Sequence, residues 1–201
     1  MSVASDPATV KDETWLPTTA YVLLGLLSFG QRLTGYELRQ WALGSTRFFW
    51  AAPAMSQIYR ELDRLERAGL VDERDESGEA ERARTTYGLT DAGLVELCRW
   101  IDDAPSDEPV IRHPAAFRLF LGHLADGDKL RARLLAHREW LDGLLADLDD
   151  VRAGLAGEDR FAYPAMVADW GLEFFGAERS ATDGVLRRIT DSVESSRSPR
   201  H

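Results

Sequence analysis

The amino-acid sequence predicts a mainly α-helical protein in two parts, with a single two-stranded hairpin in the first part. Three observations lead to this fold class. Apolar residues recur every three or four positions through most of the chain, which is the period of a helix with one buried face. Residues 70–74 and 85–89 are instead short strand candidates around a polar turn at Ser77–Gly78. The acidic, proline-containing stretch DDAPSDEP then indicates a linker between two domains.

Two helices are expected before residue 45. Thr18 can cap the first, and Gly30 ends it. The apolar residues of the first helix share one face: Ala20, Leu23, Leu24 and Leu27. The second helix begins at TGYE, where Thr34 and Glu37 can form a capping box that satisfies two free backbone N–H groups. Its inward residues are Leu38, Trp41 and Ala42, and it ends near Gly44.

A third helix is predicted from about residue 54 to residue 68, with Gly69 as the glycine that follows its end. Four apolar residues at helical spacing should face the core: Met55, Ile58, Leu62 and Leu65. Four polar residues fall on the opposite face: Gln57, Arg60, Arg64 and Arg67. This row of arginines is unexpected in a chain with a formal net charge of -10.

The hairpin at residues 70–74 and 85–89 comes next, followed by a fourth helix capped by Thr90 or Asp91. The apolar stripe of that helix is Leu94, Leu97, Cys98 and Ile101. Because the linker follows directly, we predict two domains, residues 16–104 and residues 111–195.

The second domain is predicted to be entirely helical, with a long helix after the cap at Asp126–Asp128. Two interleaved series of residues recur along the long helix every seven positions, as in a coiled coil. The first series is Leu134, Leu141, Leu148 and Leu155, and the second is Leu130, His137, Leu144 and Val151. We therefore expect this helix to hold a homodimer together, with these dimerisation residues: Leu134, Leu141, Leu144 and Leu148.

Three helices followed by a hairpin form the order of a winged helix-turn-helix, in which the third helix enters the DNA major groove and the hairpin, or wing, reaches phosphates. Arginine can bind guanine or a phosphate through two parallel hydrogen bonds. Arg82 and Arg84 lie beside the second strand, where a wing would contact the DNA backbone. The alternative is a solvated helix face whose arginines pair with neighbouring carboxylates, and helical spacing alone does not separate the two. The candidate partners are Glu61, Asp63 and Glu66.

Three segments resemble, in order and spacing, the PadR family of bacterial transcriptional regulators: AYVLLGLLSFGQRLTGYEL, SQIYRELDRLERAGLV and TTYGLTDAG. The resemblance covers roughly residues 19–93. It implies a homodimer, usually a repressor, that is often released from its operator by a small molecule. Together with the arginine pattern it gives these candidate DNA-binding residues: Tyr36, Ser56, Gln57, Tyr59, Arg60, Arg64, Arg82 and Arg84. One departure from the family is the acidic stretch DESGEAE at the tip of the wing.

Aromatic residues are frequent in the second half of the chain and can either line an effector pocket or pack between helices. The candidate effector-binding residues are Trp100, Phe117, Phe120, Trp140, Trp170 and Phe174. A small, largely apolar aromatic molecule is the effector that such a lining would select.

Composition limits the other classes of function. The single cysteine excludes an internal disulfide framework, and the N-terminal residues lack the regions of a secretion signal. The longest apolar run, near residues 20–29, is too short to span a bilayer, so we expect a cytoplasmic protein. Histidine and cysteine show no metal-ligand spacing, and no phosphate loop or nucleophile elbow occurs. We therefore expect no enzyme, no cofactor and no metal site.

The alternative to a DNA-binding regulator is a winged-helix module whose acidic surface binds a protein.

Overall fold

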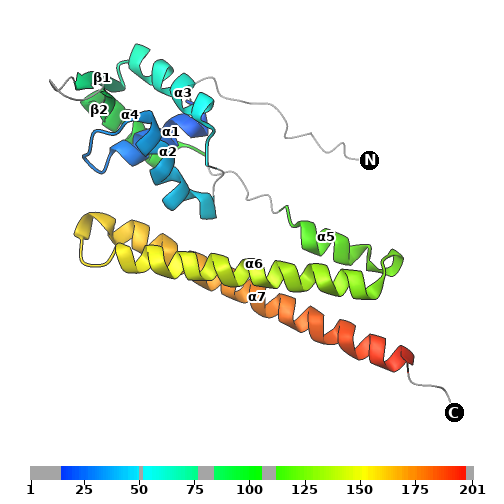
Figure 1. The fold of residues 1–201 in the computed structure, drawn as a ribbon. Helices are drawn as coiled ribbons and strands as arrows, with labels where there is room; N and C mark the ends of the chain where they lie inside the picture. The colour runs from blue at the N-terminus through cyan, green and yellow to red at the C-terminus, as the bar shows by residue number, and fades with distance from the viewer. Residues whose placement is uncertain (1–14, 50–51, 77–83, 106–111, 198–201) are drawn as a thin grey trace, which may run out of the picture. The chain divides into compact units, whose positions relative to one another are not determined.

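The computed structural model describes residues 15–49, 52–76, 84–105 and 112–197, and Figure 1 shows the fold. The chain divides into two compact units, residues 1–107 and residues 108–201. The first unit contains helices and one two-stranded antiparallel sheet, and the second is helical in its described part. The predicted fold class is therefore confirmed. Among the described residues, no helix combines the length and the apolar character needed to cross a membrane.

Three helices build the core of the first unit: α1 (Thr18–Leu27), α2 (Gly35–Gly44) and α3 (Met55–Arg67), with a short 3-10 turn, η1 (Thr46–Phe48), after α2. The capping box of α2 is present, since Glu37 N–H donates to the Thr34 hydroxyl and the Glu37 carboxylate accepts from Thr34 N–H. Gly69 adopts a positive φ of 70° after α3, the conformation expected of a glycine at a helix end. The predicted inward residues Ile58, Leu62 and Leu65 are completely buried.

The hairpin consists of β1 (Val71–Glu76) and β2 (Arg84–Leu89), paired in register from Val71 with Leu89 to Glu76 with Arg84. Leu33 adds a backbone bridge to Tyr87. Arg32 fastens the hairpin to the helices, because its guanidinium donates to the Asp72 carboxylate at 2.9 Å and to the Thr86 carbonyl at 3.0 Å. These charge-assisted bonds hold the pKa of Asp72 below its ordinary value. The base of the wing is therefore fixed relative to α2.

The fourth helix, α4 (Asp91–Asp103), is capped by Thr90, whose hydroxyl accepts from Gly93 N–H. Only part of its predicted apolar stripe is buried. Leu97 lies in the core, whereas Leu94, Cys98 and Ile101 are exposed. The stripe was expected to face inward as a whole, but within its own unit α4 contacts the core through a narrower face.

The second unit contains α5 (Pro114–Phe120), η2 (Gly122–Leu124), α6 (Gly127–Gly154), η3 (Asp159–Phe161) and α7 (Ala162–Arg197). Helices α6 and α7 lie side by side as an antiparallel hairpin, and α5 packs against α6 (Figure 1). Arginine–carboxylate ion pairs cross between the long helices. They include Arg138 with Asp183 and Arg152 with Asp169, each at 2.6 Å, and Arg179 with Asp142.

This hairpin corrects the expectation for the leucine series on α6. Leu134, Leu141 and Leu148 are at most 4% exposed, and α7 covers them within the same chain. Gly171 on α7 leaves room for Leu148, since an added Cβ would lie only 3.3 Å from that side chain. Leu144 is half-buried. The seven-residue repeat therefore describes a seam between α6 and α7, and three of the four predicted dimerisation residues are not available to a second chain.

Candidate DNA-binding surface

The starts of α2 and α3 are packed closely together. Gly35, the first residue of α2, lies under the ring of Tyr59 on α3, and an added Cβ would be 2.8 Å from the nearest ring atom. Only glycine permits this approach without a shift of the ring. The contact places the first turn of α2 beside the exposed face of α3.

Four predicted DNA-binding residues are exposed on this joined surface. Tyr36 and Tyr59 are 61% and 47% exposed, which is high for aromatic side chains. Ser56 is exposed in the first turn of α3, and the Arg60 side chain is 66% exposed one turn later. Two aromatic hydroxyls, one aliphatic hydroxyl and a guanidinium are the donors that bind phosphates and base edges.

Gln57 was expected to contact DNA, but its side chain is directed at another helix. Its side-chain amide donates to the Thr19 hydroxyl of α1 at 2.9 Å, and the residue is half-buried. In this arrangement Gln57 connects α1 to α3 and is turned away from the exposed face. Its sequence position suggested exposure because helical spacing does not show which neighbouring helix lies beside that edge.

The arginines of α3 surround a buried carboxylate. Glu61 is 3% exposed, and its two oxygens lie 3.6 Å from Arg60 Nε and 3.4 Å from Arg64 Nε. Within the described part of the chain, Glu61 Oε2 accepts no hydrogen bond. Arg67 pairs with Asp63 at 3.3 Å on the exposed surface. The alternative interpretation placed Glu61 on a solvated helix surface, yet Glu61 forms part of the helix's buried side and partly neutralises two arginines.

On the wing, Arg84 forms an ion pair with Glu37 of α2. The Arg84 guanidinium is the main reason why the pKa of Glu37 lies below its ordinary value, and the Thr34 N–H group adds to the effect. Arg84 is thereby held next to the start of α2 while its side chain remains 53% exposed. Arg82 lies outside the described residues.

Of the six aromatic residues expected at an effector pocket, Trp170 and Phe174 stack on each other, with ring centroids 5.8 Å apart. Trp100 stacks on Tyr21 in the first unit, with ring centroids 4.5 Å apart. The other five belong to the second unit and are exposed, namely Phe117, Phe120, Trp140, Trp170 and Phe174. An open groove of about 410 Å³ lies between α5 and α6, and Trp140 is the one member of the set that lines it. Leu130, Arg118 and Arg133 contribute further lining.

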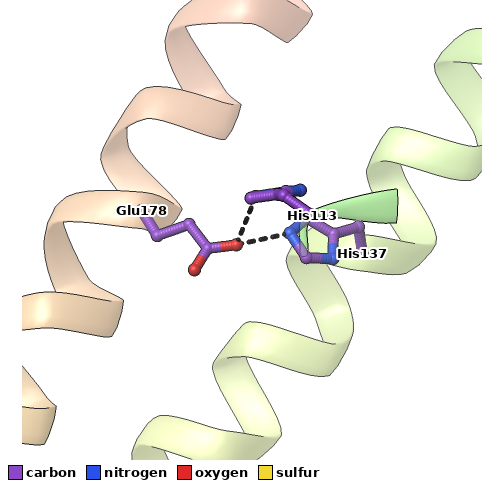
Figure 2. Close-up of side chains that lie close together, drawn as sticks. All are labelled: His113, His137 and Glu178. Atoms are coloured by element: carbon purple, nitrogen blue, oxygen red, sulfur yellow. Dashed lines mark hydrogen bonds and ion pairs between the residues drawn. The ribbon is translucent and has the colours of Figure 1, made fainter. Parts of the chain in front are cut away.

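Sequence spacing also missed a polar cluster in the second unit. His113, His137 and Glu178 come from three segments and converge on one point, as Figure 2 shows. Both histidine Nε2 atoms lie 2.8 Å from the same oxygen of Glu178. Intervals of 24 and 41 residues match no local metal-binding motif, so only the helix hairpin reveals the cluster. The sequence did single out His137, because it is a polar residue at an apolar position of the seven-residue repeat.

Comparison with known proteins finds similarity to transcriptional regulators. Residues 23–99 match the model of the transcriptional regulator PadR-like family. The negative transcriptional regulator PadR of Bacillus subtilis strain 168 is 36% identical over 81 residues, which are 40% of this chain and 43% of that protein. The aligned part thus spans less than half the length of that relative.

Solved structures show the same fold over most of the chain. Bacillus subtilis PadR in complex with operator DNA has a TM-score of 0.75 and 22% identity, covering 86% of this chain and 99% of that chain. The same protein in complex with p-coumaric acid has a TM-score of 0.69, 22% identity and the same coverage. The virulence activator AphA of Vibrio cholerae has a TM-score of 0.66 and 23% identity, covering 86% and 98%. The family and these relatives are transcriptional regulators and not enzymes, in agreement with the prediction for this chain.

Proposed function

We propose that this chain, whose residues 23–99 belong to the PadR-like family of transcriptional regulators, binds a specific double-stranded operator through the joined starts of α2 and α3. The observation that carries the proposal is the set of exposed donors on this surface: Tyr36, Ser56, Tyr59 and Arg60. Arg60 contacts bases near the start of α3, while Arg64 and Arg84 contact phosphates. The likeness to the fold of a PadR protein crystallised with operator DNA supports DNA as the binding partner.

The same regulator is proposed to act as a homodimer, through α7 rather than through the leucine seam. Five apolar side chains on α7 are between 39% and 79% exposed: Tyr163, Met166, Val167, Trp170 and Phe174. Their spacing of three or four residues places them on one helix face. A continuous apolar face of this kind is rarely left in water by a single chain, and pairing of two copies also matches the two half-sites of an operator.

Repression that is relieved by a small aromatic molecule is the regulation we propose. The groove between α5 and α6 is large enough for such a molecule, since ligand sites span about 300–1,000 Å³. Leu130 and Trp140 offer apolar contact, and Arg118 and Arg133 offer charge for a carboxylate. A PadR structure with p-coumaric acid is among the similar folds and supports an acid of this class. Such a regulator works in the cytoplasm, where the DNA is.

Two observations favour a second function, a winged-helix module that binds a protein. Arg60 and Arg64 are partly neutralised by Glu61, and the chain as a whole carries a formal charge of -10. Both features weaken non-specific attraction to DNA. An acidic surface would instead attract a basic protein partner.

Competitive binding to a randomised double-stranded library at two salt concentrations separates the two functions. We expect selection of a two-fold symmetric site whose half-sites lie about one helical turn apart. The selected DNA should then release the protein when a small aromatic acid is added, and the acid should bind less tightly to the DNA complex by the same factor. Recovery of no preferred sequence would favour the protein-binding module.

A further inference from the structure

We propose that His113, His137 and Glu178 form a binding site for one divalent transition metal ion of the zinc class. The three side chains come from the residue before α5, from the middle of α6 and from the middle of α7, and they point toward one another (Figure 2). One potential ligand atom of each lies within 4.8 Å of the other two. All three are described residues of the second unit.

The donor set selects the class of metal. Two imidazole nitrogens and one carboxylate oxygen are the ligands of many three-residue zinc sites, in which water or another ligand completes the coordination. Imidazole suits zinc, copper, iron and nickel, whereas calcium and magnesium prefer sites made of oxygen alone. The side chains of His113, His137 and Glu178 are 30%, 19% and 21% exposed, so the cluster is partly shielded yet open to an entering ion.

The distances require little rearrangement. Both Nε2 atoms lie 2.8 Å from Glu178 Oε1, and His137 hydrogen-bonds to that oxygen. In a tetrahedral site with bonds of about 2.0–2.1 Å, ligand atoms are about 3.3 Å apart. Each Nε2 atom therefore needs to move roughly half an ångström farther from Glu178 Oε1 to admit the ion.

Neighbouring rings restrict the two histidines. His137 stacks on Trp140 with centroids 5.6 Å apart, and His113 lies against His137 at 5.2 Å. Packing of this kind limits the rotamers of a ligand and favours a preformed site.

His113 also caps the start of α5, and metal binding would disturb this cap. Ala116 N–H donates to His113 Nδ1 at 3.0 Å, so in the neutral ring the hydrogen resides on Nε2, which lies 2.8 Å from Glu178 Oε1. Metal binding at Nε2 moves that hydrogen to Nδ1 and ends the cap of α5. Binding should therefore loosen the first turn of α5, and it should weaken as the pH falls because protons compete for the same nitrogens.

The test uses the full untagged chain, freed of metal by a chelator and titrated with Zn²⁺ against a chromophoric chelator. We expect one ion per chain. H113N retains a capping side chain, and E178Q retains a hydrogen-bond acceptor, so both variants keep the fold by circular dichroism. Each should lower the affinity at least about tenfold, as should H137N.

His123 and Glu173 provide matched controls, because both are exposed residues of the same unit outside the cluster. H123A and E173Q should bind Zn²⁺ like the unchanged chain. Co²⁺ should give the intense visible absorption of a four-coordinate ion, and H137N should remove it. Failure of the unchanged chain to bind one equivalent, or tight binding that survives in folded H137N and E178Q, would overturn the proposal.

Discussion

Replacement of Gly35 with alanine perturbs the proposed DNA-binding surface without removing any predicted DNA contact. The added Cβ would lie 2.8 Å from Tyr59 Cε1, 2.9 Å from Cζ and 3.1 Å from the hydroxyl oxygen. Carbon atoms in ordinary contact are about 3.5–4.0 Å apart, so the ring must move by about 0.7 Å or more. Tyr59 would then no longer hold the position it has in the folded protein.

The expected cost falls on DNA binding rather than on folding. Tyr59 is 47% exposed, so its ring can shift toward solvent. Alanine in a helix is favoured over glycine by about 0.5–1 kcal/mol, so the free energy of unfolding should change by less than about 1 kcal/mol. Displacement of one hydrogen-bonding group at the interface should cost about 1–2 kcal/mol, or about 5- to 30-fold in operator affinity.

The assay is fluorescence anisotropy with the selected operator, combined with urea unfolding. G25A is the matched control, because an added Cβ at Gly25 in α1 meets nothing within 4 Å. A double-mutant cycle isolates the cause: in a Y59A background, G35A should have no further effect on affinity. Unchanged affinity of G35A, or an equal loss with and without Tyr59, would show that Tyr59 does not contact DNA from this position.

The remaining predictions concern contacts, assembly and pH. Arg60→Ala should weaken operator binding by about 1–3 kcal/mol and relax the base preference at one position of each half-site. Arg84→Ala should instead weaken binding to all sequences alike and reduce the salt dependence. Library selection at two salt concentrations measures both effects. Trp170→Asp should give a folded monomer in sedimentation experiments, while Leu141→Asp should unfold the helical hairpin in circular dichroism, because Leu141 is completely buried within one chain. Burial, reinforced by the Glu73 carboxylate, raises the pKa of Tyr87 to about 12 from 10.0. The contribution of neutral Tyr87 to the free energy of unfolding should therefore be fully present below pH 10 and be lost between pH 10 and pH 12. Tyr87→Phe should lessen this loss in urea titrations. Each prediction is contradicted if its variant gives the same result as the unchanged chain in the assay named for it.

Local signals in the sequence predicted the first unit well. The capping box of Thr34 and Glu37 depends on residues three positions apart, and the buried row of Ile58, Leu62 and Leu65 depends on helical spacing alone. The two strands were expected at residues 70–74 and 85–89 and occur at Val71–Glu76 and Arg84–Leu89. These features need no knowledge of which helix packs against which.

Contacts between distant residues could not be predicted in this way. Gln57 bonds to Thr19, 38 positions earlier, and His137 meets Glu178, 41 positions later. The leucine series on α6 shows the same limit. A seven-residue repeat states that a helix has an apolar seam, but it does not state whether the partner is α7 or a second chain.

The burial of Glu61 offers a physical reason why an acidic chain can carry a specific DNA-binding surface. Ion pairs at 3.4 Å and 3.6 Å reduce the effective charge of Arg64 and Arg60 before any DNA is present. Long-range attraction to the phosphate backbone is sequence-independent, so its reduction weakens binding to all DNA alike. Hydrogen bonds to base edges act only at contact distance and depend on the base sequence, so they are less sensitive to the overall charge of the chain. We therefore expect the proposed operator binding to depend less on general attraction to DNA and more on the fit of Tyr36, Tyr59 and Arg60 to one site.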